Sequence, residues 1–207
     1  MIETERKEAL DAICDQVSVC TKCRLSETRT KAVPGSGDYS SRVMFIGEAP
    51  GANEDKEGIP FCGAAGKFLD EMLASIELDR DKIFITNSVK CRPPENRDPE
   101  DDEKSVCRPY LEKQIELIKP RLIVALGRHA ATTLLPGMPG ISKIHGKALK
   151  RPNGIVYLPL YHPAAALHNG GLRSTLISDF QKIPAILNKI EEFKKEEKDQ
   201  SKQETLI

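Results

Sequence analysis

Four of the six cysteines have a spacing that suits metal ligation. Cys20 and Cys23 are separated by two residues, which places two thiolates about one turn apart, and Cys91 and Cys107 could supply two more. Four thiolates suit either zinc or an iron-sulfur cluster. Zinc knuckles more often consist of two close pairs, so the widely split second pair slightly favours a cluster, but the spacing leaves both open.

A second group of chemically capable residues follows four short apolar runs. It supplies a carboxylate, an amide, a cation and an imidazole, from Glu48, Asn87, Arg128 and His162. If the runs are parallel strands, their carboxyl ends meet in one crevice, where loops converge and helix N-termini point inward. The pattern predicts an active site there. The alternative is ordinary loop polarity, since asparagine and other small polar residues often cap helices.

The elements that must position these groups alternate along the chain. Four runs rich in β-branched residues are predicted to be strands: Val43 to Gly47, Lys82 to Asn87, Leu122 to Gly127 and Ile155 to Tyr161. Four segments have helical patterns: Ala64 to Ile76, Pro99 to Ile118, Arg128 to Leu135 and Leu172 to Phe180. The alternation predicts an α/β protein with a parallel sheet covered by helices on both faces.

Length and composition predict a single domain. The chain has 207 residues, 39% of them hydrophobic, which suffices for one well-buried core. We expect this domain to span residues 1–190, followed by a charged, flexible tail over 191–207. The first residues are too charged for a secretory signal, and no run is long enough for a membrane span. We therefore expect an intracellular protein, in which disulfides are disfavoured.

Basic residues are concentrated in one part of a chain whose formal net charge is zero. No Asp or Glu occurs from Leu117 to Ser178, whereas eight Lys and Arg residues do. This distribution could form a phosphate-binding surface, or it could be a chance cluster on a solvated face.

Several longer motifs give the sequence a family likeness. They are the Cys20–Cys23 pair, VPGSGDYSSRVMFIGEAPGANEDKEGIPFCGAAG, ITNSVKCRPPENRDP, Cys107, LIVALGRHA and LPLYHPAAAL. In this order and spacing, from about Cys20 to Pro184, the chain resembles the family 4 uracil-DNA glycosylases. The resemblance implies an α/β/α fold with a central four-stranded parallel sheet. It also implies excision of uracil from DNA by hydrolysis of the N-glycosidic bond, in base excision repair, by a cytoplasmic, nucleoid-associated enzyme. For the cysteines Cys20, Cys23, Cys91 and Cys107, it implies a 4Fe-4S cluster.

The resemblance also assigns uracil-binding residues. Phe61 resembles the aromatic platform on which the flipped base stacks. Asn87 resembles the amide that reads the uracil edge and can reject cytosine, whose exocyclic amine reverses a hydrogen bond. His162 resembles the histidine that hydrogen-bonds uracil O2 as the base departs. The backbone around Ala49 and Pro50 is expected to contact the base.

Two carboxylates are candidates for the remaining chemistry. Glu48 and Glu54 follow the first predicted strand. One of them could stabilise a positively charged sugar in the transition state or orient the attacking water. We favour Glu48, which would also contact uracil, over Glu54.

Expected DNA contacts come from four further residues. Leu167 is placed to wedge into the space that the flipped base vacates, and phosphate contacts are expected from Arg128, Lys143 and Lys147. We expect a monomer that binds uracil-containing DNA, double- or single-stranded. The segment Gln203 to Ile207 faintly resembles a sliding-clamp-binding peptide without its aromatic pair, so a clamp contact is a minor expectation.

Two rival functions are open to such a chain. The first is a relative that traps uracil-DNA covalently through a histidine on an added basic loop. That loop is missing, because Lys90 is followed directly by CRPPENRDP. The second is a non-enzymatic iron-sulfur module that binds DNA, which would not require Phe61, Asn87 and His162 at converging strand ends. Turnover on uracil-DNA distinguishes all three functions.

Overall fold

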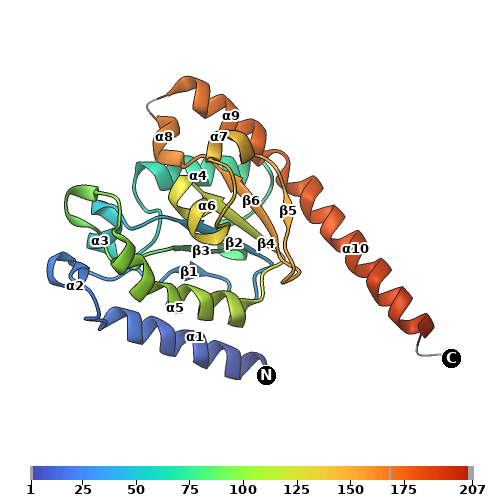
Figure 1. The fold of residues 1–207 in the computed structure, drawn as a ribbon, viewed down its shortest axis with the longest axis horizontal. Helices are drawn as coiled ribbons and strands as arrows, with labels where there is room; N and C mark the ends of the chain where they lie inside the picture. Colours follow the sequence, from blue (N-terminus) through green and yellow to red (C-terminus); the bar gives the residue numbers. More distant parts are fainter. Residues whose placement is uncertain (1, 168, 205–207) are drawn as a thin grey trace.

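A six-stranded mixed sheet forms the centre of the computed structural model, which describes residues 2–167 and 169–204 (Figure 1). The strand order is β1-β3-β2-β4-β6-β5. The inner four strands are parallel, and the short outer strands are antiparallel to their neighbours. The strands are β1 (Ser36–Gly37), β2 (Val43–Gly47), β3 (Phe84–Asn87), β4 (Leu122–Leu126), β5 (Leu149–Lys150) and β6 (Val156–Leu160).

Helices cover both faces of the sheet (Figure 1). The α-helices are α1 (Glu3–Ser18), α2 (Leu25–Thr28), α3 (Ala52–Glu57), α4 (Ala64–Ala74), α5 (Asp101–Ile118), α6 (Arg128–Leu134), α7 (Ile141–Ile144), α8 (Pro163–Leu167), α9 (Gly170–Phe180) and α10 (Ile183–Glu204). Two 3-10 helices, Arg80–Lys82 and Pro94–Asn96, lie in the connections.

The alternation of side chains along β2 divides the core into two layers. Val43 and Phe45 pack with residues of α4, α9 and α10, whereas Met44 and Ile46 pack with residues of α1 and α5. Successive strand residues point to opposite faces, and a parallel sheet covered on both sides has fully buried strands. The predicted three-layer α/β arrangement with four central parallel strands is therefore confirmed.

The sheet is wider than the four strands that the sequence predicts. The two additional strands, β1 and β5, contain only two residues each. Segments of this length carry no periodicity that could be recognised in a sequence, and β1 includes a glycine, a residue depleted in strands. Both pair antiparallel at the edges of the sheet, so they leave the predicted parallel core unchanged.

The charged C-terminal region, which composition predicts to be a flexible tail, is helical over most of its length. Helix α10 continues through it as far as Glu204 and projects away from the body of the molecule (Figure 1). The chain contains no Gly or Pro after Pro184, and it is rich in Lys and Glu, which are good helix formers. The clamp-like segment lies largely outside the described residues, and the division into a domain and a flexible tail stays a prediction. Across residues 2–167 and 169–204, no helix combines the length and apolar character that a bilayer crossing would require.

Candidate active site and metal centre

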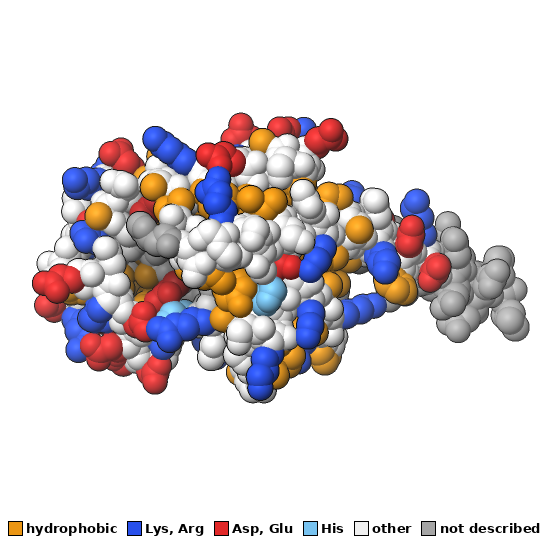
Figure 2. Space-filling model, turned by 90° about the horizontal axis from the view of Figure 1, so that it is seen from above, with side chains coloured by type: hydrophobic (Ala, Val, Ile, Leu, Met, Phe, Trp, Pro, Cys, Tyr) orange, Lys and Arg blue, Asp and Glu red, His pale blue; other side chains and the backbone are white. Residues whose placement is uncertain are grey.

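The carboxyl ends of the four parallel strands converge as predicted. Gly47, the last residue of β2, lies beside Asn87, the last residue of β3, and β4 and β6 end in register next to them. The loops that follow carry Glu48, Arg128 and His162. Viewed from above relative to Figure 1, the surface has a hollow lined by acidic and histidine side chains, with lysines and arginines nearby (Figure 2).

Phe61 and Asn87 meet over the backbone of Gly47. A Cβ atom on Gly47 would lie 2.4 Å from Asn87 Oδ1 and 2.8 Å from Phe61 Cζ, so only glycine fits between them. Asn87 is 1% exposed, and its Oδ1 is buried with no hydrogen-bond partner among the described residues. A buried acceptor without a partner costs about 1–3 kcal/mol. A buried amide whose oxygen could accept a hydrogen bond from a ligand therefore lies beside an aromatic ring.

The loop that carries Phe61 is held by Glu54. The Oε1 atom of Glu54 accepts hydrogen bonds from the backbone N–H groups of Cys62 at 3.1 Å and Gly63 at 3.0 Å, and Oε2 accepts one from Gly51 at 3.1 Å. Phe61 itself has a φ of 50°, an unfavourable value for a bulky residue. Glu54, the second candidate carboxylate, therefore accepts from three backbone amides and holds the strained loop that carries Phe61.

His162 lies against Phe61. Its ring stacks on that of Phe61 with 5.5 Å between the centroids and 27° between the planes. The backbone N–H of Ala164 donates to His162 Nδ1 at 3.1 Å. Burial lowers the pKa of His162 to about 4, against a smaller opposing effect of Glu54. At neutral pH the imidazole is therefore uncharged, and because Nδ1 accepts, Nε2 carries the proton and can donate.

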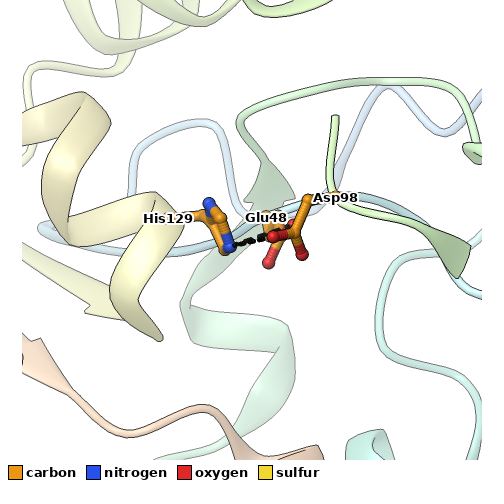
Figure 3. Close-up of side chains that lie close together, drawn as sticks. All are labelled: Glu48, Asp98 and His129. Atoms are coloured by element: carbon orange, nitrogen blue, oxygen red, sulfur yellow. Dashed lines mark ion pairs between the residues drawn. The ribbon is translucent and has the colours of Figure 1, made fainter. Parts of the chain in front are cut away.

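Glu48 belongs to a cluster that the sequence did not indicate (Figure 3). Its Oε1 lies 3.8 Å from His129 Nε2, and Asp98 Oδ2 lies 3.1 Å from the same nitrogen. The latter pair does not have the geometry of a hydrogen bond. Burial lowers the pKa of His129, so the pair is an ion pair only when His129 is protonated. Burial, and then the negative charge of Asp98, raise the pKa of Glu48 to about 7.

Asp98 also pairs with the predicted DNA-contacting arginine. Arg128 Nη2 donates to Asp98 Oδ2 at 2.7 Å, and both side chains are more than half exposed. Asp98 and His129 were not among the predicted site residues, although both lie within motifs of the family likeness, RDP and GRHA. Only the fold brings the loop before α5 against the start of α6.

The other predicted contacts surround the pocket at different depths. Pro50 is buried and lacks an N–H donor, and Ala49 is half-buried against the core layer under α1 and α5. Leu167 ends the short helix that starts right after His162, and it is 38% exposed. Lys143 and Lys147 are both exposed, on and just after α7.

The four predicted metal ligands lie around one small cavity. Cys91 and Cys107 are buried, Cys20 and Cys23 are half-buried, and all four line this cavity. Two donors point at the sulfur atoms: Arg29 Nη1 lies 2.8 Å from Cys91 Sγ, and the backbone N of Lys90 lies 3.2 Å from Cys107 Sγ. Burial raises the pKa values of Cys91 and Cys107, the latter to about 11, so their thiolates need a compensating charge.

Comparisons with known proteins agree with this geometry. The sequence profile of the uracil DNA glycosylase superfamily matches residues 34–184. A type-4 uracil-DNA glycosylase of Sulfurisphaera tokodaii is 50% identical over 85% of this chain and 84% of its own length. The enzymes of that name from Saccharolobus solfataricus and Archaeoglobus fulgidus are 49% and 44% identical, over 86% and 88% of this chain and 87% and 95% of theirs.

Proposed function

The chain belongs to the type-4 uracil-DNA glycosylases of the uracil DNA glycosylase superfamily, and from this premise we propose that it excises uracil by hydrolysing the bond between base and deoxyribose. The observation that carries the proposal is the buried Oδ1 of Asn87, which lies beside the ring of Phe61 and has no hydrogen-bond partner among the described residues. A planar base with an N–H donor can donate a hydrogen bond to Asn87 Oδ1 and stack on the Phe61 ring at the same time.

Uracil recognition follows from the chemistry of the Asn87 amide. Its Oδ1 accepts from uracil N3–H, and its amino group donates to uracil O4. Cytosine presents an acceptor and a donor at these two positions, so it would leave both amide groups unpaired. A site built to hydrogen-bond its substrate rejects such an analogue by about 10⁴–10⁵-fold. Phe61 supplies the stacking surface for a base flipped out of the helix.

Departure of the base is assisted by His162. Uracil leaves with negative charge on its O2 atom, and the neutral imidazole donates its Nε2 proton in a hydrogen bond to that oxygen. The Ala164 N–H fixes the tautomer that makes this donation possible. A preorganised donor of this kind contributes about 10²–10³-fold in rate.

Glu48 serves the sugar side of the reaction. In its carboxylate form it stabilises positive charge on the deoxyribose or accepts a proton from the attacking water. A pKa near 7 makes this form pH-dependent close to neutrality. Glu54 has the role of a positioning residue, because its oxygens are already engaged by the loop that holds Phe61.

The DNA duplex is bound by the surface around the pocket. Leu167 is exposed at the end of α8 and fills the gap left by the flipped nucleotide. Arg128, Lys143 and Lys147 contact phosphates, and for Arg128 this requires exchange of Asp98 for a phosphate oxygen. A phosphate thereby replaces the carboxylate as the partner of the guanidinium.

A 4Fe-4S cluster held by Cys20, Cys23, Cys91 and Cys107 is the cofactor that we propose. Four thiolates around a single zinc ion lie about 3.8 Å apart. Within the described residues, the only group of three or more such ligand atoms that all lie within 4.8 Å of one another is Glu48, Asp98 and His129, so no three of the cysteine sulfurs lie that close together. This spread fits a multi-iron cluster, which would link α1, α2 and α5 as a structural centre.

The experiment that tests the base-reading proposal compares uracil and cytosine. Initial rates of base release are measured on oligonucleotides with one uracil or one cytosine opposite guanine, for wild type, Asn87→Ala and the exposed control Asn188→Ala. We expect wild type and the control to release only uracil, and Asn87→Ala to lose at least about 10²-fold in kcat/KM. Equal uracil rates for wild type and Asn87→Ala would refute the assignment.

A further inference from the structure

Lys90 is buried between the cysteine centre and the base-reading amide. It is 1% exposed, it immediately precedes Cys91, and its side chain folds back toward β3. Its ammonium group donates three hydrogen bonds: to the backbone oxygen of Asn87 at 2.9 Å, to Thr86 Oγ1 at 2.5 Å and to Gln114 Oε1 at 2.7 Å. A lysine ammonium has three protons, so its donors are fully used.

The acceptors of Lys90 are themselves fixed. Thr86 Oγ1 and Gln114 Nε2 both donate to the backbone oxygen of Pro34, at 2.9 Å and 2.8 Å. Gln114 and Thr86 are each 0% exposed. The network therefore joins the end of β3, the middle of α5 and the segment before β1, and it closes directly behind the residue whose side chain reads the base.

The charge of Lys90 has no carboxylate partner among these bonds. A lysine is almost never fully buried unless it is paired, and removal of an ammonium from water is costly. The cysteine centre adjoins the backbone of this residue: the backbone N–H of Lys90 donates to Cys107 Sγ at 3.2 Å, and Cys91 is the next residue in the chain. Negative charge on Cys107, and less strongly on Cys14, which is not one of the four ligands, acts on the Lys90 ammonium. Thiolates bound to a metal cluster would provide such a compensating charge.

We propose that Lys90 is a positioning residue that connects the cysteine centre to uracil recognition, because it holds the backbone of Asn87 while its charge is balanced by metal-bound thiolates. This inference rests on the proposed function. It assigns the centre a role in base discrimination in addition to holding helices together. Methionine at position 90 would preserve the volume of the side chain and remove all three hydrogen bonds.

The test compares Lys90→Met with Lys113→Met, an exposed lysine next to Gln114 on α5. Three quantities are measured well below the melting temperature: iron content with visible absorbance, the ratio of kcat/KM for uracil to that for cytosine, and the inhibition constant of free uracil. For iron-loaded Lys90→Met we expect an inhibition constant raised about tenfold or more and a lower uracil-to-cytosine ratio. Lys113→Met should match wild type in all three.

The outcomes separate positioning from simple stabilisation. An iron-loaded Lys90→Met protein with a lower melting temperature but wild-type uracil inhibition and discrimination overturns the proposal. If Lys90→Met yields no folded protein, Thr86→Val is tested instead, because it removes one acceptor of the Lys90 ammonium and keeps the positive charge of Lys90. A weaker uracil inhibition in that variant with unchanged iron supports the proposal, and wild-type inhibition overturns it. Failure of wild type to release uracil would instead contradict the proposed function.

Discussion

His162 combines three features that suit a neutral hydrogen-bond donor: burial, a fixed tautomer and contact with Phe61. We predict that His162→Ala lowers the single-turnover rate of uracil release by about 10²–10³-fold, because one preorganised donor to the leaving group is removed. DNA binding should change little. The control is His145→Gln, since His145 contacts the buried Asp179 outside the pocket. A His162→Ala enzyme within threefold of wild type would rule out this role.

We predict that Glu48 sets the pH dependence of the reaction. Its pKa is raised to about 7, so its carboxylate form is lost as the pH falls through neutrality, and the rate should decline below about pH 7. His162 has a pKa lowered to about 4 and stays neutral over this range. The measurement is the pH profile of single-turnover uracil release between pH 5 and 9.

Asp98→Asn should shift that profile. The charge of Asp98 helps to raise the pKa of Glu48, so its removal should move the acidic limb to lower pH and increase activity at pH 6 relative to pH 8. The control is Asp81→Asn, which changes a surface carboxylate that is not among the charges acting on Glu48. The acidic limb of the pH–rate profile of this variant should coincide with that of wild type. An unchanged limb in Asp98→Asn would show that another group controls the profile.

At the scale of single residues, those that end strands could be predicted from the sequence. Asn87 ends β3 and His162 follows β6, so the parallel sheet places both at its carboxyl edge. Asp98 lies 50 residues after Glu48 in an irregular loop, and its contact with His129 depends on how α5 and α6 pack. The bracing role of Glu54 was equally hidden, because its three partners are backbone amides rather than side chains.

At the scale of elements, the start of α5 is fixed by a buried carboxylate. The side chain of Glu103 is 0% exposed and accepts from Arg97 at 2.6 and 2.8 Å, from Arg24 at 3.0 Å and from the backbone of Glu100 at 2.8 Å. These bonds lower the pKa of Glu103 to about 2, and the hydrogen bond from Arg97 makes the largest contribution. They connect the residue after Cys23 to the helix that carries Cys107.

We predict that Glu103→Gln destabilises the protein by about 2 kcal/mol at pH 7. This is less than for a fully buried pair, because both arginines are partly exposed. The folded-state pKa lies below the unfolded value, so the stabilisation is present above about pH 4.5 and is lost as the pH falls toward 2. Urea unfolding at pH 7 and pH 3 should therefore show a smaller gap between variant and wild type at pH 3. An equal gap at both values would contradict the ionic explanation.

Elements were predictable from sequence where their patterns were long. The four inner strands are mainly apolar because both of their faces are buried, and the predicted helices were found within a few residues of their observed bounds. Helix α1 was missed because only three of its sixteen residues, Leu10, Ile13 and Val17, are buried. The two-residue edge strands are defined by pairing partners that no local pattern reveals.

At the scale of the whole molecule, DNA binding depends on charge distribution rather than net charge. Replacement of both Lys143 and Lys147 by Gln should reduce the slope of log Kd against log salt by about 1 for each phosphate that is no longer neutralised. The affinity should fall by a similar factor for uracil-containing and undamaged duplexes, since phosphates carry no base information. Fluorescence anisotropy over a salt series measures the slope. The control is the double variant Lys113→Gln and Lys189→Gln. Equal slopes in the two double variants would show that Lys143 and Lys147 do not contact DNA phosphates.

The whole molecule is expected to act as a hydrolytic uracil-DNA glycosylase that turns over. The most direct test incubates purified protein, without added metal, with a tenfold excess of a single-uracil oligonucleotide and quantifies free uracil and abasic DNA. We predict several moles of uracil released per mole of protein, an abasic product that alkali cleaves, and a collapse of the rate in His162→Ala. A stoichiometric covalent adduct, or tight binding without any uracil released, would contradict the account.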